Sequence, residues 1–204
     1  VDLSGGAQPM WTADGQIGVV FNGEIYNHVA LRAELQKLGC DFQTDHSDTE
    51  VLLHAYARWG DAFVERLNGM WAFVIYDRAR RRLFASRDRF AKKPLYYFHE
   101  GDTFGFASEL PALREHSRCP HEVSRLSLKK YFAYCYIPAP RSIYERVWKD
   151  NRRRSTEKIS TWDVLHTYAS DYKVIFVGDA SMSPYEITQP GGSVEYNNEE
   201  AGAV

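Results

Sequence analysis

The chain has 204 residues, 44% of them hydrophobic, which is enough to bury the core of one large or two small domains. Its formal net charge of -2 gives no electrostatic reason for nucleic acid or an anionic membrane as a partner, and no apolar stretch is long enough to span a bilayer. Three scattered cysteines are too few for a disulfide framework or a zinc site, so we expect a cytoplasmic protein.

The first predicted elements are a strand and a helix. Residues 18–25 form an apolar run typical of a strand. Leu31, Leu35 and Leu38 then recur at helical spacing, and Gly39 marks the end of that helix. A strand followed by an amphipathic helix predicts a core between the two.

A second helix is predicted to begin at a capping box. Ser47 and Glu50 have the spacing at which each side chain can accept from the other's backbone N–H. The helix ends at Gly60, and it directs these residues toward a core: Val51, Leu52, Ala55, Tyr56 and Trp59.

Four strands follow the helices. Residues 70–77 are almost entirely apolar, which is typical of a strand covered on both faces. Further strands are expected at residues 81–86, 95–98 and 103–107, with a turn at residues 100–102. Antiparallel strands with helices packed outside them predict a layered α+β domain.

The chain changes character after Val147. Residues 149–158 are polar and charged, and the three arginines among them indicate either a solvated connection or a phosphate-binding or nucleic-acid-binding patch. A short helix is expected at residues 161–168 and a strand at residues 173–177. Residues 190–204 are rich in Gly, Asn and Glu and are expected to be poorly ordered.

Asn22 and Gly23 form the pair with the clearest chemical potential. A side-chain amide and the backbone N–H of a glycine can converge on one point as an oxyanion hole, although Asn-Gly is also the commonest hairpin turn. A Cβ at Gly23 would obstruct a substrate approaching closely. Asp48 suits the first turn of a helix, where the helix dipole favours an acid.

Several long motifs together resemble the glutaminase domain of glutamine-hydrolysing asparagine synthetases, the class II glutamine amidotransferases. The likeness covers residues 1–147 and includes the run Phe21-Asn22-Gly23-Glu24-Ile25-Tyr26-Asn27. The other matching segments are residues 2–10, 31–35, 47–53, 66–73, 87–97, 106–110 and 136–145.

This resemblance implies a fold, a reaction and site residues. The fold would be the four-layer αββα sandwich of N-terminal-nucleophile hydrolases, and the reaction the release of ammonia from glutamine. Asn22 and Gly23 would supply the oxyanion hole, Asp48 would pair with the substrate's α-ammonium group, and Glu24 would also bind substrate. ATP and Mg²⁺ would belong to a synthetase domain, so no cofactor is expected in this chain.

The chain also departs from the family pattern. It begins with Val1, which we do not expect to be its natural start, and it has neither the family's opening Cys-Gly-Ile nor the arginine segment that binds the substrate carboxylate. We therefore expect it to be truncated at its N-terminus and catalytically incomplete. Ala91 and Cys135 stand where the family usually has glycine, and Ala91 should be tolerated only with a negative φ. Cys40 and Cys119, like Cys135, are expected to be ordinary thiols.

Residues 148–201 resemble the C-terminal region of bacterial von Willebrand factor A-like proteins, which places a domain boundary between residues 147 and 148. Asp179, Ser181 and Ser183 have the Asp-x-Ser-x-Ser spelling that offers oxygen ligands to Mg²⁺ in A-type domains, or they form a loop that caps a strand. The segment is too short for the remaining ligands, so no metal site is predicted. An alternative function is a non-catalytic module that uses this segment to bind a partner or Mg²⁺.

Overall fold

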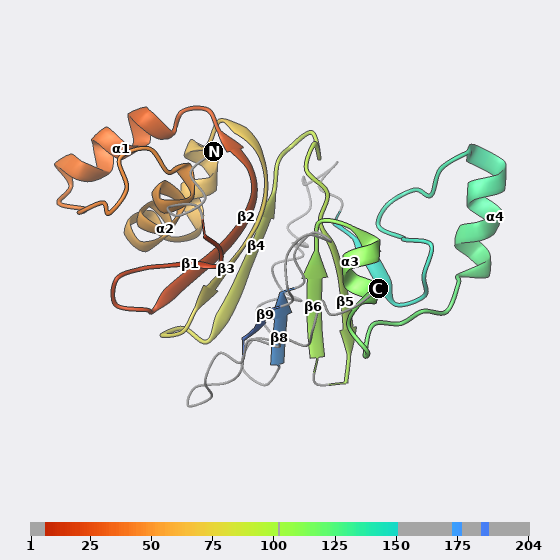
Figure 1. Ribbon diagram of the computed structural model, residues 1–204. Coiled ribbons are helices and arrows are strands. Elements are labelled where there is room, and N and C mark those ends of the chain that lie inside the picture. The colour runs from red at the N-terminus through yellow and green to blue at the C-terminus, as the bar shows by residue number, and fades with distance from the viewer. Residues whose placement is uncertain (1–6, 102, 151–172, 177–184, 188–204) are drawn as a thin grey trace, which may run out of the picture. The chain divides into compact units, whose positions relative to one another are not determined.

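The computed structural model describes residues 7–101, 103–150, 173–176 and 185–187 (Figure 1). The described residues fall into two compact units. The first contains residues 7–93, and the second contains residues 94–150 together with 173–176 and 185–187. Each unit combines helices with a sheet whose strand pairs are all or mostly antiparallel, which is consistent with the predicted α+β class.

The first unit is built on a four-stranded antiparallel sheet with the strand order β1-β2-β3-β4. Its long strands β2 and β3 pair along their whole length, from Ile17 opposite Asp77 to Ile25 opposite Gly69. The predicted strands are confirmed with small shifts at their ends. The four strands are β1 (Met10–Trp11), β2 (Ile17–Ile25), β3 (Gly69–Asp77) and β4 (Arg82–Arg87).

Helices α1 (His28–Lys37) and α2 (Asp48–Trp59) lie on the same side of this sheet in Figure 1 and are followed by a 3₁₀ helix, η1 (Gly60–Arg66). Leu31 and Leu35 of α1 are buried, as their spacing predicts, but Leu38 lies beyond the helix and is exposed. The core joins the inward residues of both helices to Phe73 and its neighbours on the strands. Burying this apolar face is what stabilises the two short helices, which would be marginal alone.

A buried hydrogen bond ties α2 to the central strand β3. The hydroxyl of Tyr56 donates to Asp77 Oδ2 at 3.1 Å, and the main-chain N–H and guanidinium of Arg80 donate to the same carboxylate. Burial raises the pKa of Tyr56 to about 12, with the neighbouring Asp77 carboxylate adding to the shift. Tyr56 is therefore a neutral donor at physiological pH. Residues 71–77 are all buried, in agreement with the prediction for this strand.

The second unit contains a five-stranded sheet with the order β7-β5-β6-β8-β9, in which β6 and β8 run parallel and every other pair is antiparallel. Gly101 has a φ of +59° in the predicted turn between β5 and β6. Strand β7 lies across the predicted domain boundary, and β8 confirms the strand expected near residue 173. The strands are β5 (Tyr96–Glu100), β6 (Thr103–Ala107), β7 (Val147–Lys149), β8 (Lys173–Phe176) and β9 (Tyr185–Ile187).

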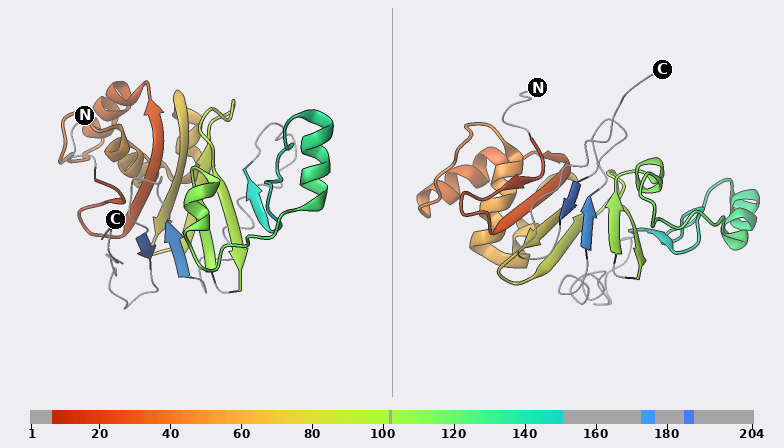
Figure 2. Two further views of the ribbon diagram at one scale, coloured as in Figure 1. Left: turned by 45° about the vertical axis from the view of Figure 1, so that its right-hand side comes forward. Right: turned by 60° about the horizontal axis from the view of Figure 1, so that its bottom comes forward.

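Two helices accompany this sheet. Helix α3 (Leu110–Arg114) packs Ala112 and Leu113 into the small core of the unit. Helix α4 (Arg125–Tyr134) stands away from β5 and β6 in every view of Figures 1 and 2, and Ser127 is its one buried residue. Core packing therefore stabilises α3 more than it stabilises α4.

The remaining predictions concern residues outside the described ranges. They are the connection at residues 151–158, the helix at residues 161–168 and the C-terminal residues 190–204. Among the described residues, no helix is long and apolar enough to cross a membrane.

Candidate functional site

Asn22 and Gly23 lie in strand β2, opposite Ala72 and Trp71 of β3, and both are partly exposed. They are part of a long strand pair, so the alternative prediction of a hairpin turn at Asn-Gly is wrong. The side chain of Gln8 holds the preceding residue at two points. Its Oε1 accepts from the Phe21 N–H at 2.6 Å, and its Nε2 donates to the Phe21 carbonyl at 2.9 Å.

Gly23 is required here for a reason that the sequence does not show. A Cβ at this position would lie 2.2 Å from the Met70 carbonyl oxygen and 2.8 Å from the Trp71 Cα, both backbone atoms of β3. Gly69 has the reciprocal role, since a Cβ there would lie 2.1 Å from the Glu24 carbonyl oxygen. The two glycines let the end of β2 and the start of β3 approach more closely than residues with side chains could.

Asp48 is the first residue of α2, and its carboxylate reaches strand β2. Its Oδ2 accepts a hydrogen bond from the Ile25 N–H at 3.0 Å. Ile25 is the last residue of β2 and lies three positions after Asn22. Asp48 is therefore bonded to the same strand that contains Asn22 and Gly23, close to that strand's C-terminal end.

The loop before Asp48 is fixed by buried charges. Arg32, on α1, is 8% exposed, and its guanidinium donates to the Ser47 carbonyl at 2.8 Å and to the Thr44 carbonyl. It also stacks over the Phe42 ring at 4.2 Å. Carbonyl oxygens and an aromatic face compensate the cation in place of water. Arg32 thereby sets the position from which α2 and Asp48 begin.

Glu50 fixes the same loop from the helix side. Its carboxylate accepts from the Gln43 N–H at 2.6 Å and from the Thr44 N–H and hydroxyl at 2.8 and 2.6 Å. Burial acts to raise the pKa of Glu50, but these hydrogen bonds outweigh it and the pKa is lowered. The predicted capping box is thus wrong in one half: Ser47 Oγ accepts from the Glu50 N–H at 3.3 Å, whereas Glu50 bonds to the loop and not to Ser47.

Asn27, two residues after the end of β2, bonds that end of the strand to the segment just before β3. Its Nδ2 donates to the Arg66 carbonyl and its Oδ1 accepts from the Asn68 N–H, both at 2.9 Å. No role was predicted from the sequence for Asn27, Gln8 or Arg32. All three lie within the motif segments that carry the family resemblance, which is the signal that could have found them. Glu24, the second expected substrate contact, is exposed on β2 opposite Met70.

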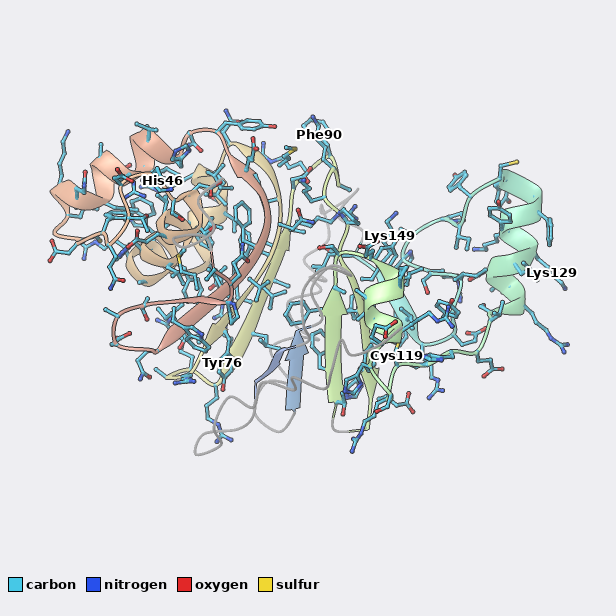
Figure 3. All side chains as sticks on the ribbon, viewed as in Figure 1. His46, Tyr76, Phe90, Cys119, Lys129 and Lys149 are labelled. Atoms are coloured by element: carbon cyan, nitrogen blue, oxygen red, sulfur yellow. The ribbon has the colours of Figure 1, made fainter. Side chains whose placement is uncertain are left out.

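A compact loop follows β4 and is organised around the buried Asp88 carboxylate. This group accepts from the N–H groups of Phe90, Lys92 and Lys93 at 2.9 to 3.1 Å. Figure 3 labels Phe90 at the tip of this loop, where its ring is 79% exposed. Ala91 has a φ of +55°, so the expectation of a negative φ is wrong. The turn imposes the left-handed conformation, and the many hydrogen bonds of the loop offset its cost.

The cysteines behave as ordinary thiols in this structure. Cys119 lies beside α3 (Figure 3) and is buried, and its burial raises the pKa of its thiol to about 11. Cys135 is exposed and follows α4 with a φ of +60°, the left-handed cap position that glycine usually fills. Cys40 is partly buried against the core of the first unit. A thiol held protonated by burial is a poor nucleophile.

The weak metal candidates Asp179, Ser181 and Ser183 lie outside the described residues, and their role stays a prediction. Where the structure describes the chain, it brings no three His, Cys, Asp or Glu side chains together as a metal site. What the candidate site offers is an amide, a glycine N–H and a carboxylate at one strand end. Where an amide, a backbone N–H and a carboxylate converge, they can bind a small polar molecule with a carbonyl and a positive group.

Comparison with known proteins identifies the family. A family model described as a glutamine amidotransferase domain matches residues 1–157. Asparagine synthetase [glutamine-hydrolyzing] 3 of Bacillus subtilis is 44% identical over 134 residues, which make up 65% of this chain and 22% of that protein. Putative asparagine synthetase [glutamine-hydrolyzing] 2 of Methanocaldococcus jannaschii is 36% identical over 170 residues, 78% of this chain and 31% of that protein.

Among solved structures, the chain is similar to glutamine phosphoribosylpyrophosphate amidotransferase from Bacillus subtilis, complexed with ADP and GMP. The sequence identity is 28% and the TM-score 0.40, over 47% of this chain and 23% of that one. This chain spans between about a fifth and a third of the length of the two curated relatives described above.

Proposed function

The chain belongs to the glutamine amidotransferase domain family, and on that basis we propose that it is the glutaminase part of an asparagine synthetase-like enzyme. Its substrate is glutamine, and its role in the whole enzyme is to supply ammonia. Asn22 and Gly23 donate to the oxyanion, Asp48 binds the substrate's α-ammonium group, and Glu24 lies beside them as a further substrate contact. The four-layer αββα sandwich is part of the same proposal.

One observation carries the assignment of the site. The Asp48 carboxylate is hydrogen-bonded to the Ile25 N–H at the end of the strand that contains Asn22 and Gly23. This bond uses one of the several acceptor positions of the carboxylate, so the group can still accept from an ammonium group. Charge-assisted hydrogen bonds of this kind are about twice as strong as neutral ones. An acid and two candidate oxyanion donors on one strand end suit an amino acid with a side-chain amide.

Substrate binding and turnover are separate properties in this proposal. The motif that supplies the family's nucleophilic cysteine and its amine base has no counterpart among residues 1–204. We therefore propose that the polypeptide Val1–Val204 binds glutamine but does not hydrolyse it. The weaker binding expected without the family's carboxylate-binding arginine should still depend on Asp48.

Calorimetric titration with L-glutamine tests the proposal. The Val1–Val204 polypeptide is expected to bind it, and Asp48→Asn should weaken the binding by at least about tenfold, because a neutral amide cannot pair with an ammonium group. The side-chain carbonyl oxygen introduced by this substitution can still accept from the Ile25 N–H, so the variant retains the structural contact.

Asp41→Asn is the matched control, because Asp41 is exposed and lies in the loop ahead of α2. It removes the same charge and should leave the affinity unchanged. Equal weakening by both variants, or no binding to the unmodified polypeptide, would contradict the assigned site.

A further inference from the structure

Strand β6 has the properties of an interior strand. All its residues, Thr103 to Ala107, are buried, and Thr103, Phe104, Phe106 and Ala107 are each at most 3% exposed. Gly105 lies against the Phe98 ring, where a Cβ would come within 2.2 Å of Cε1. A strand this apolar, left at the edge of a sheet, would present unpaired N–H and C=O groups without charge or proline to protect them.

One neighbour of β6 comes from its own hairpin. Strand β5 pairs with it antiparallel, from Tyr96 opposite Ala107 to Glu100 opposite Thr103. The opposite edge of β6 is covered by β8, which runs parallel from Lys173 opposite Thr103 to Phe176 opposite Phe106. Residues 173–176 lie beyond residue 157, where the family match ends. The second neighbour of β6 therefore comes from outside the matched domain.

The β6–β8 pair rests on few interactions. Strand β8 spans Lys173–Phe176, and parallel pairing is slightly less stable per residue than antiparallel pairing. Since both strands belong to one chain, their pairing is intramolecular and is favoured over the binding of a separate segment at low concentration. If the pairing of β8 depends mainly on its being in the same chain, a separate peptide of the same sequence can take its place beside β6 at sufficient concentration. Main-chain hydrogen bonds to an apolar edge are the means by which strand addition gives affinity.

We infer that the edge of β6 opposite β5 is a strand-acceptor site, and that its occupant is the chain's own segment Lys173–Phe176. The site takes an extended apolar segment in parallel register. It accepts the same segment as a separate peptide when the covalently attached one is prevented from pairing. This is a binding surface of the second unit and is independent of the candidate glutamine site in the first.

Residue-resolved amide exchange on the whole chain tests the inference. In the double variant Val174→Pro/Ile175→Pro, β8 loses two donors and its extended pairing. Along β6 successive N–H groups point to alternate sides. Every second amide of Thr103–Ala107 should therefore exchange at least about tenfold faster, while the amides directed at β5 remain protected. Glu199→Pro/Glu200→Pro, outside β8 and β9, should change none of them.

A peptide with the sequence of residues 171–178 provides the second arm. At millimolar concentration it should restore protection to the same alternate amides in the double variant and leave the unmodified chain, whose site is occupied, unchanged. A peptide carrying the two prolines should have no effect. If the double substitution also speeds amide exchange in β5 and β7, the peptide still tests the inference, because only a filled acceptor site would restore protection to the alternate amides of β6. Unchanged protection in the double variant, or failure of the peptide to restore lost protection, would overturn the inference.

Discussion

At the scale of single residues, Gly23 has two separate explanations, one from the chemistry of the expected site and one from the packing of the backbone. From the sequence, a glycine beside Asn22 is explained by access for a substrate. In the structure, the reason is the approach of two backbones, because the space of its Cβ is filled by the Met70 carbonyl. Both explanations can be true, but only the close approach of the two backbones requires a glycine when no substrate is bound.

Gly23→Ala is expected to lower the free energy of unfolding by about 3 kcal/mol, because both atoms that a Cβ would meet first belong to the backbone and cannot rotate away. Gly39→Ala is the control. Gly39 also has a positive φ, +87°, but nothing lies within 4 Å of its Cβ position, so the cost should be about 1 kcal/mol of backbone strain. Urea unfolding measures both, and equal losses would refute the steric explanation.

Ala91 and Cys135 should be improved by glycine, since both have left-handed backbone conformations, with φ of +55° and +60°. Ala91→Gly and Cys135→Gly are each expected to raise the free energy of unfolding by about 0.5 kcal/mol, the relief of strain exceeding the entropy gained by the unfolded chain. Ala33→Gly, at an exposed position in α1, should lower it by about 1 kcal/mol. A loss of stability in either glycine variant, measured by urea unfolding, would contradict this account.

The residues of the candidate site could be selected from the sequence, but the contacts that surround them could not be predicted. The sequence singles out Asn22, Gly23 and Asp48, and the structure brings Asp48 to the strand of the other two. It does not reveal that Gln8 holds Phe21 or that Arg32 is buried, because those contacts depend on how separate elements meet. The φ of Ala91 was predicted wrongly for the same reason, since a turn built on Asp88 decides it.

At the scale of elements, the start of α2 depends on a carboxylate that serves the loop before it. Glu50 accepts three hydrogen bonds from Gln43 and Thr44, and these bonds lower its pKa in the folded protein. A folded-state pKa below the unfolded one contributes stability that is present above the unfolded value of about 4.3 and is lost as pH falls through the folded value. The loop and Asp48 should therefore loosen in acid.

Glu50→Gln should reduce the free energy of unfolding by about 1–3 kcal/mol at pH 7, because its NH₂ group cannot accept from the loop N–H groups. The difference from the unmodified protein should begin to shrink as the pH falls below the unfolded value of about 4.3, and it should be lost below the lower folded value, where Glu50 of the folded protein becomes protonated. Urea unfolding between pH 3 and 8 follows this difference. Glu65→Gln, at an exposed position, should show almost none, and a pH-independent difference for Glu50→Gln would contradict the role of its charge.

Long elements could be predicted because their patterns repeat. The apolar run of β3 and the spacing of Leu31 and Leu35 predicted these elements nearly at their observed bounds. The short strands β1 and β7 were not predicted, since two or three residues carry no measurable period. Nor does periodicity predict the parallel pairing of β6 with β8, which joins segments about 70 residues apart.

At the scale of the whole molecule, membership of the glutamine amidotransferase domain family and the arrangement of the first unit support the same substrate. The part of the proposal that concerns catalysis depends on a nucleophile, which is a role that none of Asn22, Gly23 and Asp48 is proposed to fill. An oxyanion hole stabilises charge that develops only after a nucleophile attacks. Binding can therefore persist where turnover does not.

The Val1–Val204 polypeptide is expected to release no ammonia from L-glutamine above the background of buffer. Its Cys119 is kept protonated by burial, and Cys40 and Cys135 show no arrangement with a base that would activate them, as far as the described residues extend. An ammonia assay over a range of glutamine concentrations measures this. Saturable release that disappears in Asn22→Ala would show that another group acts as nucleophile.

The most direct test of the assigned glutamine site is an NMR titration of the polypeptide with L-glutamine, in which D-glutamine serves as the control. We predict that L-glutamine shifts the side-chain amide of Asn22 and the backbone amides of Gly23 and Ile25, the last through its hydrogen bond to Asp48. D-glutamine should have a much smaller effect. No shift at these three positions, or equal shifts with both enantiomers, would contradict a glutamine site at the end of β2.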